Sequence, residues 1–101
     1  MIPTALSDRI RNEIEDLKLD GDIRRELEAW LHADREFNVW FLETTKGKLD
    51  DDALMGLLEG YREDQEAVES AWADFWKDRD EAALTACLVR SRAKMVELQE
   101  R

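Results

Sequence analysis

Residues 49–80 carry the apolar pattern that most constrains how this chain can fold. Seven apolar side chains recur there at helical spacing and, at about 100° per residue, fall within roughly 100° of arc. They are Leu54, Leu57, Leu58, Tyr61, Val68, Trp72 and Phe75. This stripe predicts one long or once-broken amphipathic helix with a single face toward a core.

Three other segments repeat this periodicity, and we expect helices over about residues 5 or 8 to 18, 22–45 and 81–99. Their apolar faces are Leu6, Ile10, Ile14 and Leu17 in the first, Ile23, Leu27, Trp30, Leu31, Phe37 and Phe41 in the second, and Leu84, Cys87, Leu88, Met95 and Leu98 in the last. The first two helices have candidate N-caps at Thr4 or Ser7 and at Asp22. The third has Asp50, with a hydrophobic staple at Leu49, and the last has Asp78 or Asp80. Lys46-Gly47-Lys48 is expected to end the second helix.

Composition supports an all-α fold. The 101 residues include one proline and four glycines, few breaks for strands and hairpins, and 44% hydrophobic residues, too many for a disordered acidic chain. A chain of this length forms one domain, residues 1–101, around one core. We expect a small antiparallel bundle of four helices, with helices 2 and 3 as the long central pair.

The surroundings of six positions on the predicted helices need separate treatment. Asp34 falls inside an apolar stripe, where we prefer an edge position or an arginine partner over a buried polar switch. Ser91 is expected to bond to a carbonyl one turn earlier. Gly56 and Gly60 indicate either a helix break or a close helix contact. Val89 and Val96 form a second line on their helix, which is either flanked on two sides or the seam of a homodimer.

The inventory of reactive side chains argues against an enzyme. His32 is the only histidine and falls on a polar face, and Cys87, the only cysteine, falls on an apolar one. Nucleophilic triads, zinc sites and di-iron bundles all need more such residues. The aspartates around Gly21 and Arg79 do not continue into a calcium loop, and no glycine-rich phosphate loop is present. We therefore expect no catalytic residues, metal or cofactor.

Charge is the main clue to partners. The net charge is −10, of which residues 49–80 contribute −8 through eleven acids and three bases. This charge disfavours direct binding to nucleic acid or an anionic membrane and favours a cationic protein surface. No segment reaches the roughly 20 apolar residues of a membrane span, and the first residues do not resemble a secretory signal, so we expect a cytoplasmic protein. Arg90, Arg92 and Lys94 form a basic cluster expected to face helix 3.

Candidate partner-binding residues lie outside the predicted core. Five acids of the third helix, Glu59, Glu63, Glu66, Glu69 and Asp74, form a row of carboxylates on its outer face, with Glu69 to one flank. Trp40 and Trp76 lie at the edges of their apolar stripes, where tryptophan is typical of interface hot spots. The net charge of −8 over residues 49–80 gives about one charge per 6 Å of helix. This density is too low to imitate duplex DNA.

These features predict a non-enzymatic, acidic interaction protein that inhibits or regulates a basic partner that handles nucleic acid. Small acidic inhibitors made by phages and mobile elements against host nucleases or CRISPR effectors are an analogy for this class. The alternative is a homo-oligomeric structural or adaptor protein assembled through Val89 and Val96 or through the Gly56 and Gly60 strip. Salt dependence separates the two, because a carboxylate interface weakens as ionic strength rises.

Overall fold

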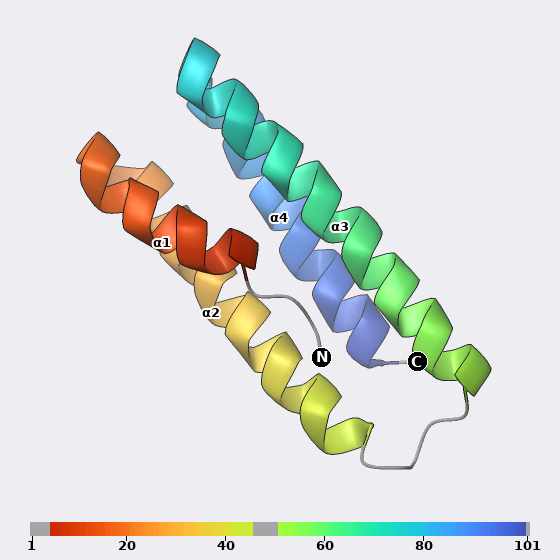
Figure 1. The fold of residues 1–101 in the computed structure, drawn as a ribbon. Helices are drawn as coiled ribbons and strands as arrows, with labels where there is room; N and C mark the ends of the chain where they lie inside the picture. Colours follow the sequence, from red (N-terminus) through yellow and green to blue (C-terminus); the bar gives the residue numbers. More distant parts are fainter. Residues whose placement is uncertain (1–4, 46–50, 101) are drawn as a thin grey trace.

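The computed structural model describes residues 5–45 and 51–100, which form four helices and no strand. The helices are α1 (Ala5–Leu17), α2 (Gly21–Thr44), α3 (Asp51–Asp78) and α4 (Glu81–Gln99). The predicted all-α bundle is confirmed, with helix ends close to those expected. Successive helices alternate in direction, so that α2 and α4 run the same way and α3 runs opposite to both (Figure 1).

The arrangement of the helices differs in one respect from the expected central pair. The two longest helices are indeed α2 and α3, with 24 and 28 residues. The most extensive backbone contacts, however, are those of α4 with both α2 and α3. Small side chains make this approach possible: a Cβ on Gly60 would lie 3.0 Å from Leu98 Cδ2, and Cys87 Sγ lies 3.7 Å from the Ala67 carbonyl oxygen.

The two glycines of α3 are therefore resolved in favour of a close helix contact, without a break. The helix is continuous from Asp51 to Asp78. Gly60 packs against Leu98, whereas a Cβ on Gly56 would meet nothing within 4 Å.

Aromatic side chains fill the middle of the core. Trp30, Phe37, Tyr61 and Trp72 are almost fully buried. The rings of Phe37 and Tyr61 stack across the α2–α3 contact with centroids 4.7 Å apart. Every apolar residue expected on the four core faces is buried or packs partly buried against the core, so the predicted helix faces are confirmed.

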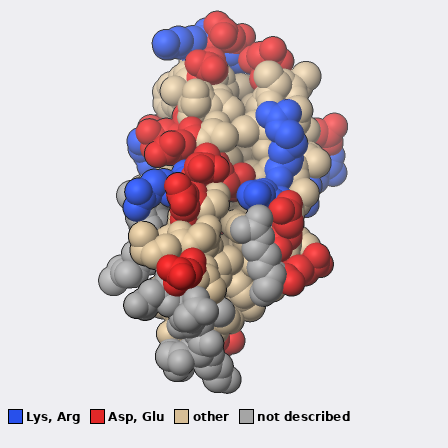
Figure 2. Space-filling model, turned by 90° about the vertical axis from the view of Figure 1, so that its right-hand side faces the viewer, with Lys and Arg blue, Asp and Glu red and all other residues tan. Residues whose placement is uncertain are grey.

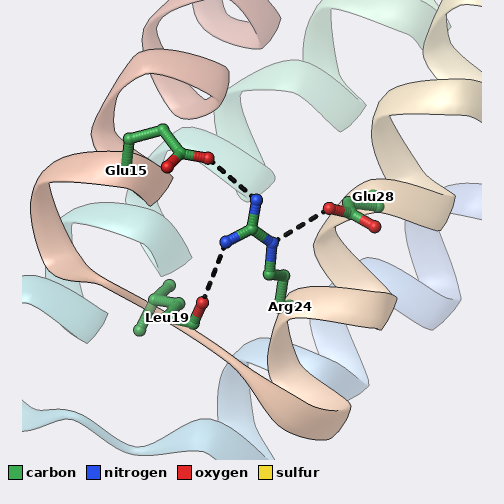
Figure 3. A network of polar contacts seen from close by, with 4 residues as sticks. All are labelled: Glu15, Leu19, Arg24 and Glu28. Carbon is green, nitrogen blue, oxygen red and sulfur yellow. Dashed lines mark hydrogen bonds and ion pairs between the residues drawn. The ribbon is translucent and has the colours of Figure 1, made fainter.

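The corner between α1 and α2 is held by a polar network (Figure 3). The Arg24 guanidinium donates to Glu15 of α1 at 2.8 Å, to the Leu19 carbonyl at 3.3 Å and to Glu28 at 3.0 Å. Gly21 takes a left-handed φ of +65°, which lets the chain turn directly into α2.

The predicted N-cap at Asp22 is wrong, and one of the two alternatives for the first helix, Ser7, is excluded. Asp20 occupies the N-cap position of α2, without a side-chain cap bond, and Asp22 lies in the first turn, where it pairs with Arg25. Ser7 lies inside α1 and is buried, so it does not occupy the N-cap position of that helix. The cap of α4 is Asp80, whose carboxylate accepts from the Ala83 amide at 3.1 Å. The predicted features at Thr4, at Lys46-Gly47-Lys48 and at Leu49 and Asp50 lie outside the described residues.

Candidate interaction surface

The acidic side chains of α3 lie on its outer side. Glu59, Glu63, Glu66 and Asp74 are all exposed, and helical spacing places them within about 80° of one another, opposite the buried Tyr61 and Trp72. Within residues 5–45 and 51–100, none of the four forms a salt bridge. We call these four residues the acidic ridge, which extends over about 22 Å at 1.5 Å per residue.

Glu69 belongs to a different side of α3. Its carboxylate lies 3.9 Å from the Arg9 guanidinium of α1, and both side chains are about half exposed. A salt bridge at this distance and exposure contributes little to stability. The contact with Arg9 shows, however, that Glu69 faces α1, whereas the four residues of the acidic ridge point away from the core.

The two candidate tryptophans also lie apart from the ridge and from each other. Trp76 is 40% exposed and meets the Trp72 ring edge-on, with centroids 6.3 Å apart. It borders an open groove of about 410 Å³ between α1 and α3, together with Arg9 and Lys77. Trp40 is half-buried on α2, 5.5 Å from the Phe37 ring. The predicted partner-binding residues thus do not form one continuous surface.

Lys and Arg side chains lie between the Asp and Glu side chains on the surface of the molecule. Figure 2 shows one side on which Asp and Glu lie among Lys and Arg and among wide uncharged areas. Of the basic cluster on α4, Arg92 does not face α3 as predicted, because its guanidinium bonds to Glu26 of α2. Lys94 lies 3.7 Å from Glu97 on the same helix. The acidic ridge is therefore a narrow row of carboxylates along α3 and does not belong to a broad acidic surface.

Asp34 is the largest departure from the sequence prediction. It is 1% exposed, which rules out an edge position. Its Oδ1 accepts from the Tyr61 hydroxyl at 2.7 Å and from the Gln65 amide at 3.1 Å, and Ser7 of α1 also hydrogen-bonds to the carboxylate. These donors are uncharged, and the Arg11 guanidinium of α1 acts on the carboxylate through its charge and not through an ion pair at contact distance, so the expected arginine partner is present only as a more distant charge.

The environment of Asp34 favours its neutral form. Burial raises the pKa of the Asp34 carboxyl above its ordinary value, and the hydrogen bonds from Tyr61, Ser7 and Gln65 offset this only in part. Burial and the nearby Asp34 charge raise the pKa of Tyr61 as well, so the phenol stays protonated and remains a donor. The geometry is that of a buried polar group, the alternative to an edge position or an arginine partner.

A second polar chain crosses the bundle nearby. The Trp30 indole Nε1 donates to Ser91 Oγ at 2.7 Å, and Ser91 in turn donates to Asp64 Oδ2 at 2.5 Å. Ser91 therefore does not bond back to its own helix as predicted. Burial raises the pKa of Asp64, and the charge of Asp34 raises it further. Sequence reasoning missed Asp64 and Gln65, although Gln65 falls inside the apolar stripe of α3 and Asp64 at its edge, where a polar residue needs a partner.

The reactive residues lie where their helix faces predict. His32 is exposed and lies 3.8 Å from Glu36. Cys87 is buried, and burial raises the pKa of its thiol. Within the described part of the chain, no group of three or more His, Cys, Asp or Glu residues could hold a metal ion.

Comparisons with protein-family models, with curated proteins and with solved structures found no significant match to this chain. Among the helices in the described residues, none is both long and apolar enough to cross a membrane. The candidate surface therefore has to be interpreted from its own geometry.

Proposed function

We propose that this chain is a non-enzymatic binding protein whose acidic ridge on α3 docks on a cationic protein surface. The partner would be a protein that handles nucleic acid, and binding would inhibit or regulate it by covering basic residues that otherwise contact phosphates. One observation carries the proposal: Glu59, Glu63, Glu66 and Asp74 are exposed on one side of a continuous helix, and no salt bridge within the described residues neutralises them.

The carboxylates of the acidic ridge raise the electrostatic free energy of the unbound protein. Four like charges along one helix side repel one another, and an opposing row of Lys or Arg side chains would relieve that repulsion. Such an interface chiefly accelerates association and weakens as salt screens the charges. The narrow ridge matches a basic groove or a single basic helix better than a broad basic face.

Reversal of ridge charges tests the proposal. Glu59→Lys with Glu63→Lys should lower affinity for the partner more than tenfold, since it removes two attractions and adds two repulsions. The matched control is Asp16→Lys with Glu43→Lys, which changes the net charge equally at exposed positions of α1 and α2. Because all four positions are exposed, each variant should keep its fold, with stability changes near 0.5 kcal/mol per site.

The measurement is affinity capture from cell extract at low and moderate salt with wild type, ridge variant and control variant as baits. We expect wild type and the control variant to capture the same partner protein, and the ridge variant to fail to capture it. The captured protein should elute when the salt concentration is raised. Purified partner should then lose nucleic-acid binding when wild type is added. Equal capture by the ridge variant and wild type would show the ridge to be ordinary solvated surface.

A further inference from the structure

Among the four helices, α1 makes the least extensive backbone contact, chiefly with α2. Figure 1 shows α1 beside α2, with the chain reversing direction at the corner between them. Long side chains connect α1 to α3: the Trp72 indole Nε1 donates to Glu13 at 2.6 Å, and the Arg9 guanidinium lies 3.9 Å from Glu69. Local openings of a folded protein involve the parts with the fewest packing contacts. If one helix of this bundle opens alone, we therefore expect it to be α1.

The same helix forms one wall of a cavity that reaches the buried Asp34. The cavity has a volume of about 210 Å³ and lies between α1 and α2. Its polar lining consists of Ser7, Asp8 and Arg11 of α1 and Asp34, Arg35 and Asn38 of α2. Asp34 is only 1% exposed, and Ser7 hydrogen-bonds to its carboxylate. The N-terminal half of α1 therefore helps to shield Asp34 from solvent.

The turn between α1 and α2 fixes the other end of α1. Arg24 donates to Glu15 at 2.8 Å and to the Leu19 carbonyl at 3.3 Å (Figure 3). Ser7 lies eight residues before Glu15, about 12 Å along the helix. A small rotation about the turn would therefore move Ser7 away from Asp34 and leave the Arg24 contacts in place.

We propose that the N-terminal half of α1 is a pH-sensitive lid over Asp34, hinged at residues 18–20, that opens as the Asp34 carboxyl loses its proton. Opening would give water access to the carboxyl and would expose Leu6 and Ile10, which the closed lid buries. No residue of the acidic ridge takes part, so the lid goes beyond the function proposed for α3 and does not depend on it.

Charged and titratable groups surround Asp34 at the cavity and in the core. They are Asp8 and Arg11 of α1, Arg35 of α2, Tyr61 and Asp64 of α3 and, acting on Asp64, Lys94 of α4. The charge of Arg11 favours the carboxylate, but burial has the larger effect and raises the pKa of Asp34. Asp64 adds a second acid to the same region, and the charge of Asp34 raises the pKa of Asp64. The closed bundle therefore favours the protonated form of Asp34.

The direction of the pH dependence follows from this balance. With the lid closed, the pKa of Asp34 is above its ordinary value, whereas water around the open site would return the pKa toward that value. Below about pH 4 the carboxyl is protonated in both states, so the closed state keeps its full advantage. As the pH rises toward the closed-state pKa, the open state releases its proton first and the lid is progressively disfavoured.

Hydrogen–deuterium exchange of the full chain, followed by mass spectrometry between about pH 4 and pH 8, tests the lid. Protection is corrected for the intrinsic pH dependence of amide exchange. In wild type, α1 amides should be less protected than α4 amides and should lose protection as the pH rises. Asp34→Asn should abolish this pH dependence in α1, because an amide cannot ionise. The matched control Asp74→Asn, at an exposed position of α3, should behave as wild type.

Two arginines of α1 provide a second comparison. Arg11→Gln removes the charge of α1 that favours the Asp34 carboxylate in the closed state, so it should deepen the loss of α1 protection at the upper end of the pH range. Arg9→Gln is the control, because Arg9 lies 3.9 Å from Glu69 on the side of α1 that faces α3, and it should leave the pH dependence unchanged.

Wild type alone also tests the lid if Asp34→Asn does not fold. The loss of α1 protection should follow the titration of the Asp34 carboxyl resonance, measured by NMR on the same protein. Equal protection of α1 and α4 at every pH would show that α1 opens only when the whole protein unfolds, which overturns the lid. A loss of α1 protection that persists in Asp34→Asn, or that does not follow the Asp34 titration, overturns the role of Asp34.

Discussion

At the scale of single residues, the buried carboxylate of Asp34 is the most informative feature. A carboxylate removed from water is costly unless hydrogen bonds replace its hydration. Here Tyr61, Gln65 and Ser7 supply those bonds from α3 and α1, so one α2 side chain ties three helices together. The hydrogen bonds fix which helix faces meet, because any rotation of α2 would leave these groups unsatisfied.

The raised pKa of Asp34 has a definite consequence for stability. Below about pH 4 the carboxyl is protonated in both folded and unfolded chains, so no charge is buried. As pH rises toward the higher folded-state pKa, the unfolded chain releases its proton first and the folded state is progressively disfavoured. The contribution of this group to stability is therefore largest in acid and declines toward neutral pH.

We predict that Asp34→Asn gains stability relative to wild type as the pH rises from about 4 to 7, because the pKa of Asp34 is raised in the folded state. The amide cannot ionise, so the variant avoids the cost of a buried charge at neutral pH. Denaturant unfolding of both proteins at a series of pH values measures the difference. Asp74→Asn, at an exposed position of α3, is the matched control and should track wild type. A difference that is independent of pH would show that Asp34 stays ionised in the folded state throughout the range.

At the scale of elements, the sequence located the helices well and their neighbours poorly. Helix position depends on local information: the apolar period of 3.6, the caps and the near absence of proline. Asp80 capping α4 is an example, because cap and amide are three residues apart. The close approach of α4 to both α2 and α3 depends on contacts between distant residues, such as Gly60 with Leu98, which one sequence does not encode in any local pattern.

The same division holds for the candidate surface. Exposure of Glu59, Glu63, Glu66 and Asp74 follows from the helical period alone, and the structure places all four on the outer side of α3. The proximity of Glu69 to Arg9, and the separation of Trp40 from Trp76, depend on where α1 and α2 lie. Side chains that hydrogen-bond across the core, such as Asp34 and Ser91, were misassigned for the same reason.

The two glycines of α3 provide a matched test of its packing. Gly56→Ala should stabilise the protein by about 0.5–1 kcal/mol, because alanine is the better helix former and its Cβ meets nothing within 4 Å. Gly60→Ala should gain less or destabilise, since the new Cβ would lie 3.0 Å from Leu98 Cδ2 and that side chain must shift. Thermal unfolding compares the two variants directly. Equal stabilisation by both would mean that α3 and α4 approach less closely at Gly60.

At the scale of the whole molecule, α4 joins the bundle together. It packs closely against α2 and α3, and its buried face includes Leu84, Leu88, Met95 and Leu98. Removal of α4 from the bundle would expose all of these side chains at once, at a cost of about 1.5–3 kcal/mol for each large apolar residue. This cost exceeds much of the stability of a typical domain of this size, so α4 should not detach while the remainder stays folded.

Cys87 on α4 reports directly on that cooperativity, because it is the only cysteine of the chain and is buried against α3. We predict that its reaction with a thiol reagent under native conditions yields a free energy of opening within about 0.5 kcal/mol of global unfolding, with the same denaturant dependence. The control is Ser70→Cys in a Cys87→Ala background, an exposed site that should react without unfolding. Faster labelling of Cys87 with a weak denaturant dependence would mean that α4 separates from α3 in a local opening. In that event the close contacts at Gly60 and Ala67 would not bind the two helices into one cooperative unit.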